Sequence, residues 1–84
     1  MSTTPSGPQV VKEFRFFSTS RYVTVVFADE TSVEFHGEDN YEEAHDTMVH
    51  AKHAGEASLE LVDQAGKTFA MVVKKDVLAE KFEA

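Results

Sequence analysis

The sequence predicts a small α+β domain, with an antiparallel sheet of about five strands and one main helix packed on it. Segments rich in β-branched and aromatic residues, with apolar side chains at a spacing of two, occur at both ends of the chain. Between them lies one segment whose apolar residues have the spacing of a helix. Short polar turns separate the strand segments. The expected order is β-β-β-α-β-β, followed by a short C-terminal helix or an edge strand.

The length and the N-terminal composition define the expected domain. The chain has 84 residues, which is enough for one domain. Residues 1–8 contain two prolines, a glycine and small polar residues, a composition that cannot bury apolar surface. We therefore predict a disordered tail over residues 1–8 and a single α+β domain over residues 9–84.

Three strands are expected before the helix. Gln9–Phe17 is rich in valine and phenylalanine, and Tyr22–Ala28 has β-branched or aromatic residues at almost every position. Ser32–His36 alternates apolar and polar side chains, as a half-buried strand does. Because only short polar turns connect these segments, we predict a three-strand antiparallel meander.

The helix is expected over the central segment. Asp39 or Asn40 can cap its N-terminus, and Gly55 suits a left-handed cap after Ala54. The apolar residues fall on one stripe, which should face the sheet. This stripe consists of Tyr41, Ala44, Met48 and Ala51.

A hairpin and one ambiguous segment complete the chain. Ala57–Asp63 and Thr68–Val73 are predicted strands, joined by a turn over Gln64–Lys67 in which a glycine is available for positive φ. Asp76–Phe82 is rich in good helix formers, so we favour a short helix there. An edge strand is the alternative.

The charge and the cysteine count narrow the expected partners and location. Eight Lys and Arg residues face fifteen Asp and Glu residues, giving a net charge of −7. An acidic chain repels phosphate backbones and anionic lipids, so we expect neither direct nucleic-acid binding nor membrane binding. The chain has no cysteine, which fits a reducing compartment, and we expect a cytoplasmic protein.

No residue pattern indicates catalysis. The four glycines are isolated, and the serines at positions 18 and 20 lack the glycine-framed elbow of a nucleophile. His50 and His53 lie near Asp46 on a helix, but their spacing matches no strong metal motif. We expect a solvated helix face there, with a bound divalent ion as the less favoured alternative. The sequence therefore predicts no enzyme, no cofactor and no metal site.

The apolar surface of the strands exceeds what one helix can cover. A helix is roughly 10 Å across, whereas five strands span on the order of 24 Å. Several strand residues should point away from the helix, which makes these strands apolar on both sides. These residues form our candidate self-association surface: Val11, Phe17, Tyr22 and Val26.

Three kinds of cover are possible for this surface. Leu78 and Phe82 of the C-terminal segment can pack over it within one chain. A second copy can cover it instead, and a dimer is the favoured oligomer. A different protein is the third possibility. We predict a non-enzymatic protein-interaction domain that self-associates through an apolar sheet face or edge.

An acidic cluster supports an alternative function. Carboxylates stabilise a helix N-terminus, but they can also form a docking surface for a basic protein partner. The alternative is therefore a small acidic inhibitor, of the kind that phages and mobile elements encode, which blocks a host nucleic-acid-binding or defence protein. The candidate acidic docking surface consists of Glu38, Asp39, Glu42, Glu43 and Asp46.

Overall fold

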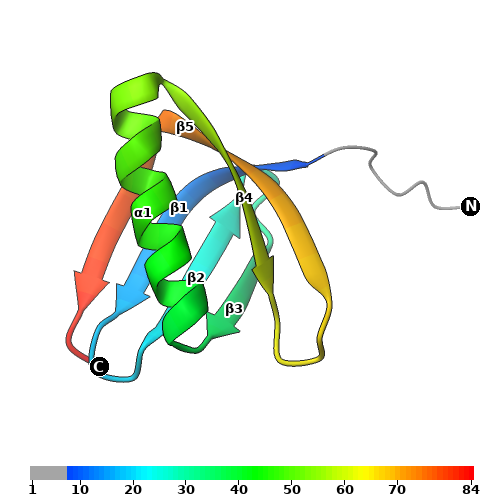
Figure 1. Cartoon of the computed structure of the whole chain (residues 1–84), viewed down its shortest axis with the longest axis vertical. Helices are drawn as coiled ribbons and strands as arrows, with labels where there is room; N and C mark the ends of the chain where they lie inside the picture. The colour runs from blue at the N-terminus through cyan, green and yellow to red at the C-terminus, as the bar shows by residue number, and fades with distance from the viewer. Residues whose placement is uncertain (1–7) are drawn as a thin grey trace, which may run out of the picture.

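The computed structural model describes residues 8–84. The predicted disordered tail lies outside these residues, apart from Pro8. The described residues form five strands and one helix (Figure 1): β1 (Gln9–Phe17), β2 (Tyr22–Phe27), β3 (Ser32–His36), α1 (Glu38–Ala54), β4 (Glu56–Val62) and β5 (Thr68–Phe82).

The five strands form one mixed sheet in the order β3-β2-β1-β5-β4. The α+β class and the element order agree with the sequence prediction, but the expectation of a purely antiparallel sheet is wrong. The central pair β1–β5 is parallel, while the other neighbouring pairs are antiparallel. The cause is the crossover through α1, which returns the chain across the sheet so that β5 runs beside β1 in the same direction.

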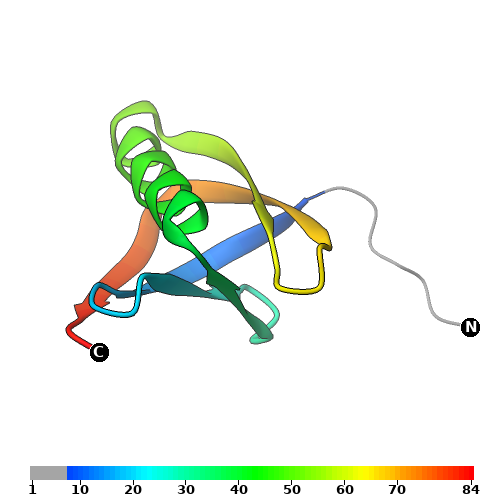
Figure 2. The ribbon, with the colours of Figure 1, turned by 60° about the horizontal axis from the view of Figure 1, so that its bottom comes forward.

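The sheet curls around α1 (Figure 2) and most of its concave face is buried, although this side is exposed beyond Val77 of β5. Phe35 on the edge strand β3 meets Phe69 on β5, with ring centroids 5.3 Å apart in an edge-to-face contact. The helix contributes small side chains to this core, including Ala44 and Ala51. The predicted shortage of cover holds only for a flat sheet. Because the real sheet is curled, its own strands supply the cover that the narrow helix lacks on this face.

The helix begins two or three residues earlier than the capping pattern predicts. Gly37 is its N-cap, with φ of 106° and no capping side chain among the described residues, so a cap at Asp39 or Asn40 is wrong. The Asn40 amide instead donates to the Val62 carbonyl at 2.8 Å and so ties the helix to β4. At the other end, Gly55 adopts the expected left-handed conformation.

Asp76–Phe82 is the C-terminal half of β5, so the favoured short helix is wrong and the strand alternative holds. The physical reason is that β1 offers this segment a complete parallel partner, from Glu13 beside Leu78 to Phe17 beside Phe82. Val77 also reaches the core and is only 4% exposed. Tertiary pairing therefore overrides the helix propensity of the residues.

Candidate functional site

The convex face of the sheet carries a row of four stacked rings, which we call the aromatic row. The rings belong to cross-strand neighbours on four consecutive strands, as the registers of β5, β1, β2 and β3 show. In order across the sheet they are Phe82, Phe17, Tyr22 and His36. Two members of the predicted self-association surface, Phe17 and Tyr22, are therefore in direct contact at the centre of this row.

The geometry of the aromatic row is that of parallel stacking. The ring centroids of Phe82 and Phe17 are 5.0 Å apart, and those of Phe17 and Tyr22 are 4.4 Å apart. Tyr22 and His36 follow at 4.5 Å, with an angle of 14° between the rings. Stacked pairs of this kind contribute about 0.5–1.5 kcal/mol each beyond their buried area. The stacked rings therefore hold one another in place. The aromatic row ends at Phe82, which is 37% exposed.

The other two residues of the predicted self-association surface, Val26 and Val11, are buried. Val26 does lie on the convex side, opposite Glu13 and Ser32, but it is only 8% exposed. Val11 lies on the concave side, where it is 3% exposed, because the register shifts between Val11 and Glu13. This bulge adds one residue to the strand and so turns Val11 towards the core. The prediction that Val11 and Val26 form an open surface is wrong.

Sequence reasoning missed the outer members of the aromatic row. The favoured helix over Asp76–Phe82 hides the position of Phe82 opposite Phe17. His36 was considered only as one of several histidines. The signal that could have found both is the alternation of side chains along strands, because cross-strand partners on one face form rows.

The C-terminal half of β5 forms a free edge of the sheet. β4 pairs with Thr68–Lys74 and then diverges, so Asp76–Phe82 has β1 on one side and no other strand among the described residues beside it. In Figure 1 this half is the red arrow at the margin of the sheet. Lys52 covers the beginning of the edge, because its ammonium donates to the carbonyls of Lys75 at 3.3 Å and Val77 at 3.0 Å.

A charged row borders the aromatic row on the convex face. Arg15 lies between Glu80 of β5 and Thr24 of β2 in the registers. Its Nε donates to a Glu13 oxygen at 3.2 Å. This hydrogen bond, with the negative charges of Glu13 and, more weakly, Glu80, raises the pKa of Arg15. Apolar rings beside fixed charges are typical of an interaction surface with a polar rim.

The five residues of the acidic docking surface are all exposed on α1. Glu38, Glu42 and Asp46 are spaced one turn apart, so their carboxylates crowd along one line. The hydrogen bond with Glu38 and its negative charge raise the pKa of Glu42, with weaker contributions from partial desolvation and Asp46. Arg21 relieves part of this crowding through Nε, 3.1 Å from a Glu38 oxygen. Asp39 and Glu43 lie on the adjacent, equally exposed side of the helix.

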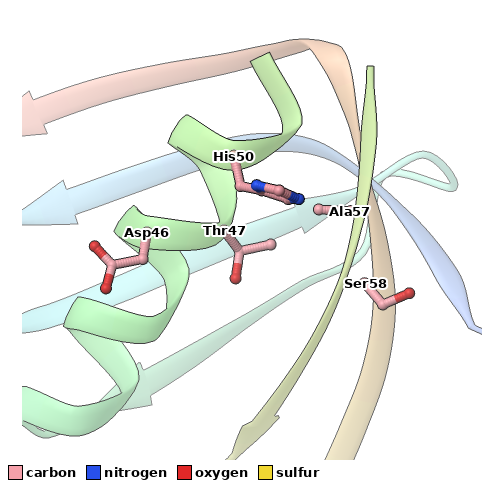
Figure 3. A pocket seen from close by; sticks show the side chains of 5 residues that line it. All are labelled: Asp46, Thr47, His50, Ala57 and Ser58. Carbon is pink, nitrogen blue, oxygen red and sulfur yellow. The ribbon is translucent and has the colours of Figure 1, made fainter. Parts of the chain in front are cut away.

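The helix and β4 border a shallow hollow (Figure 3). The His50 ring is directed towards Ala57, whereas the Asp46 carboxylate points away from it and Thr47 lies between them. Within residues 8–84, no three His, Asp or Glu side chains come together in a way that could hold a metal ion. The helix of the described chain is also too short and polar to cross a bilayer.

Scans against models of known protein families, against curated proteins and against solved structures find no match. The surfaces of the molecule are therefore the basis for inferring its function. Two surfaces are candidates: the aromatic row with the free edge of β5, and the acidic docking surface.

Proposed function

We propose that this protein is a non-enzymatic protein-interaction domain that self-associates, as a dimer, through the aromatic row and the free edge of β5. The observation that carries the proposal is the position of Phe82. This ring ends the aromatic row, is 37% exposed, and stands on the half-strand that has β1 on one side only. A second copy placed beside it removes apolar surface from water, at about 25 cal/mol per Å².

The other edges of the sheet support this choice because they are protected. β3 is a short edge of five residues that carries Glu34 and His36. On β4, Asn40 bonds both the carbonyl and the amide of Val62. Natural proteins protect sheet edges with short strands, charges and covering groups of this kind. The C-terminal half of β5 also carries charges, on Glu80 and Lys81, but its backbone is covered only at its start, where Lys52 binds.

The setting that fits this proposal is a cytoplasmic homodimer. A two-fold dimer is the commonest symmetric assembly and uses one self-complementary surface. The chain has no cysteine, so its assembly needs no oxidising compartment.

Sedimentation velocity over a range of concentrations tests the proposal. We expect the wild-type protein to shift from monomer to dimer as its concentration rises, and Phe82→Ser to stay monomeric. Val49→Ser is the matched control, since Val49 is comparably exposed, at 41%, but lies on the helix. A wild-type protein that remains monomeric throughout contradicts the proposal.

A second candidate function is the docking of a basic protein on the acidic surface. The observation that favours it is the crowding of Glu38, Glu42 and Asp46. Acids in the first turn stabilise a helix, but like charges one turn apart repel each other. Crowding that opposes stability is expected where a surface serves a basic partner, such as the nucleic-acid-handling target of a phage-type inhibitor.

A pull-down from a host lysate tests this second candidate. We expect the wild-type chain to retain a basic, nucleic-acid-handling protein at low salt and to release it at high salt, because the attraction is screened. Reversing Glu42, Glu43 and Asp46 to lysine should abolish retention without unfolding the domain. Glu60→Lys on β4 is the control and should retain the partner. Equal retention by both variants argues against docking at this surface.

A further inference from the structure

We infer that the second copy adds to β5 as an antiparallel strand, in a register centred on Glu80. Ala79 of each chain then pairs with Lys81 of the partner subunit, and Leu78 lies opposite Phe82 of the partner subunit. This inference rests on the proposed self-association and specifies the contact that it uses. The resulting dimer has one continuous sheet that crosses the two-fold axis.

Only some backbone amides and carbonyls of Asp76–Phe82 are free to pair with a new strand. The Ser18 amide donates to the Phe82 carbonyl at 2.9 Å, so the even-numbered residues of this half-strand face β1. Alternation then turns the odd-numbered residues towards the free edge. The Val77 carbonyl is already bound by Lys52. Within the described half-strand, Ala79 and Lys81 therefore each offer both an amide and a carbonyl to a new strand, whereas Val77 offers only its amide.

The register follows from matching these groups in an antiparallel pair. When Ala79 lies opposite Lys81 of the partner subunit, the two residues exchange both backbone hydrogen bonds. The two-fold axis repeats the exchange at Lys81 and the partner's Ala79. This register uses the free groups of both residues and leaves the bond between Lys52 and Val77 in place.

The exposed apolar side chains fit the same register. Leu78 is 58% exposed and Phe82 is 37% exposed, and both point to the convex side of one strand. They are four residues apart, so an axis midway between them brings each one opposite the other residue of the partner. Directly opposed side chains have Cβ atoms about 4.5–5.5 Å apart, which is contact distance for leucine and phenylalanine. Two exposed apolar residues per chain are thereby covered.

The charge of Glu80 at the axis is partly offset within each chain by Arg15, which also bonds Glu13. Glu80 faces its equivalent across the axis, but Arg15 is its neighbour on β1. Across the interface, the order of charges is then Arg15, Glu80, the partner's Glu80 and the partner's Arg15. On the concave side, Lys81 lines the same hollow as Glu42 and Asp46, and the small Ala79 of the partner subunit leaves room for it.

Neighbouring registers fit less well. An axis at Ala79 places Leu78 opposite the partner's Glu80, so an apolar side chain meets a charged one. An axis at Lys81 places Phe82 opposite the partner's Glu80, so an apolar side chain again meets a charged one. The register centred on Glu80 is the one that satisfies the backbone and pairs the exposed apolar side chains.

Cysteine crosslinking tests the register, because the chain has no cysteine of its own. In this register, Glu80→Cys places two thiols opposite each other, and mild oxidation should give a covalent dimer on a non-reducing gel. Leu78→Cys is the control, since its two copies are offset by four residues, about 13 Å along the strand. That separation is too large for a disulfide. Mixing Leu78→Cys with Phe82→Cys should restore crosslinking between the two variants.

A proline substitution tests the use of the edge independently. Ala79→Pro removes an amide that faces outwards, and a proline is tolerated at such an edge position. We expect the fold to persist, by circular dichroism, while the dissociation constant of the dimer rises at least about tenfold. Glu34→Pro on the free edge of β3 is the control, because the bonds at Phe27 and Gly37 also leave its amide facing outwards. It should fold and dimerise normally.

The outcomes separate the register from self-association itself. Crosslinking at position 80 together with a monomeric Ala79→Pro variant supports the inference. A wild-type dimer that survives Ala79→Pro, with no crosslink at position 80, overturns the edge pairing but leaves self-association through the aromatic row standing. A wild-type monomer at all concentrations overturns both.

Discussion

The two halves of β5 share one strand and one partner but differ in their surroundings. Thr68–Lys74 lies between β4 and the start of β1, and it buries Met71 and Val73. Asp76–Phe82 has β1 on one side only, and Val77 is its one buried residue. The comparison shows that a strand can be held in place by a single neighbour while leaving its other edge available for contact.

The same difference explains why the sequence predicts the first half correctly and the second half wrongly. In the first half, the side chains at positions 69, 71 and 73 are all apolar and face the core, which produces the spacing of a strand. In the second half, the corresponding side is occupied by Val77, Ala79 and Lys81. Beyond Val77 this side is exposed, so the residues need not be apolar and the alternation disappears. Helix propensity is then the strongest local signal, although pairing with β1 decides the structure.

The largest expected effect is on the buried half. Met71→Ala removes a side chain that is 1% exposed, so the loss of burial and the cavity it leaves should reduce the free energy of unfolding by about 2–5 kcal/mol. Leu78→Ala is the comparison in the open half and should change the stability of the monomer far less. Urea unfolding at a low protein concentration measures both. Similar losses for the two variants contradict the contrast between the halves.

The next effect concerns the aromatic row, which crosses β5, β1, β2 and β3. Phe17 stacks on two rings, whereas Phe82 ends the row and stacks on one. Because Phe17 is only half-buried, Phe17→Ala should cost about 1–3 kcal/mol, less than a fully buried phenylalanine. Phe82→Ala should cost the monomer less than Phe17→Ala, yet weaken the dimer more than its effect on folding explains. Thermal unfolding and sedimentation of the same two variants separate these effects.

The fold could be predicted from the sequence wherever the side chains alternate between core and solvent. Each of the first three strands, the helix with its glycine C-cap, and the hairpin that follows were predicted within a few residues. The parallel pairing of β1 with β5 was not predicted, because no local pattern in either strand encodes its partner. The curl of the sheet was also missed, and with it the cover of the concave face.

The candidate surface was predicted in part for similar reasons. Phe17 and Tyr22 were found because both lie in clear strand segments on the side opposite the core residues. Val11 was placed on the wrong side, since the bulge after it reverses the alternation and leaves no obvious mark in the sequence. The sequence predicts that Phe82 can pack over the apolar surface of the strands, but it does not predict its place in the aromatic row.

The junction between the two halves gives a smaller effect. Lys52→Met retains the length of the side chain but loses the bonds from the ammonium to the carbonyls of Lys75 and Val77. We expect a loss of about 0.5–1.5 kcal/mol in the free energy of unfolding, as for other hydrogen bonds. Lys75→Met is the matched control, because its exposed ammonium makes no ion pair within residues 8–84. If the two variants behave alike, Lys52 does not secure the edge.

The smallest effect is expected where the open half of β5 approaches the helix. Lys81 lines a hollow with Glu42 and Asp46, so the charge of Glu42 lies close to the C-terminal half of β5. Glu38 raises the pKa of Glu42 through a hydrogen bond and its negative charge. A raised pKa in the folded state means that the stability linked to this group is complete below the ordinary glutamate pKa. It is lost as the pH rises through the raised pKa of Glu42.

Glu42→Gln should therefore raise the unfolding temperature slightly near neutral pH, because the repulsion from Glu38 and Asp46 is removed. The gain should disappear on acidification to about pH 3, where the glutamate of the wild-type protein is protonated and no longer repels its neighbours. Thermal unfolding at the two pH values measures the difference, with Glu43→Gln as a control outside the line of crowded carboxylates. If Glu42→Gln lowers the unfolding temperature at neutral pH, attraction to Lys81 and Arg21 outweighs the repulsion. The acidic surface would then stabilise the open half of β5 and would no longer favour docking of a basic partner.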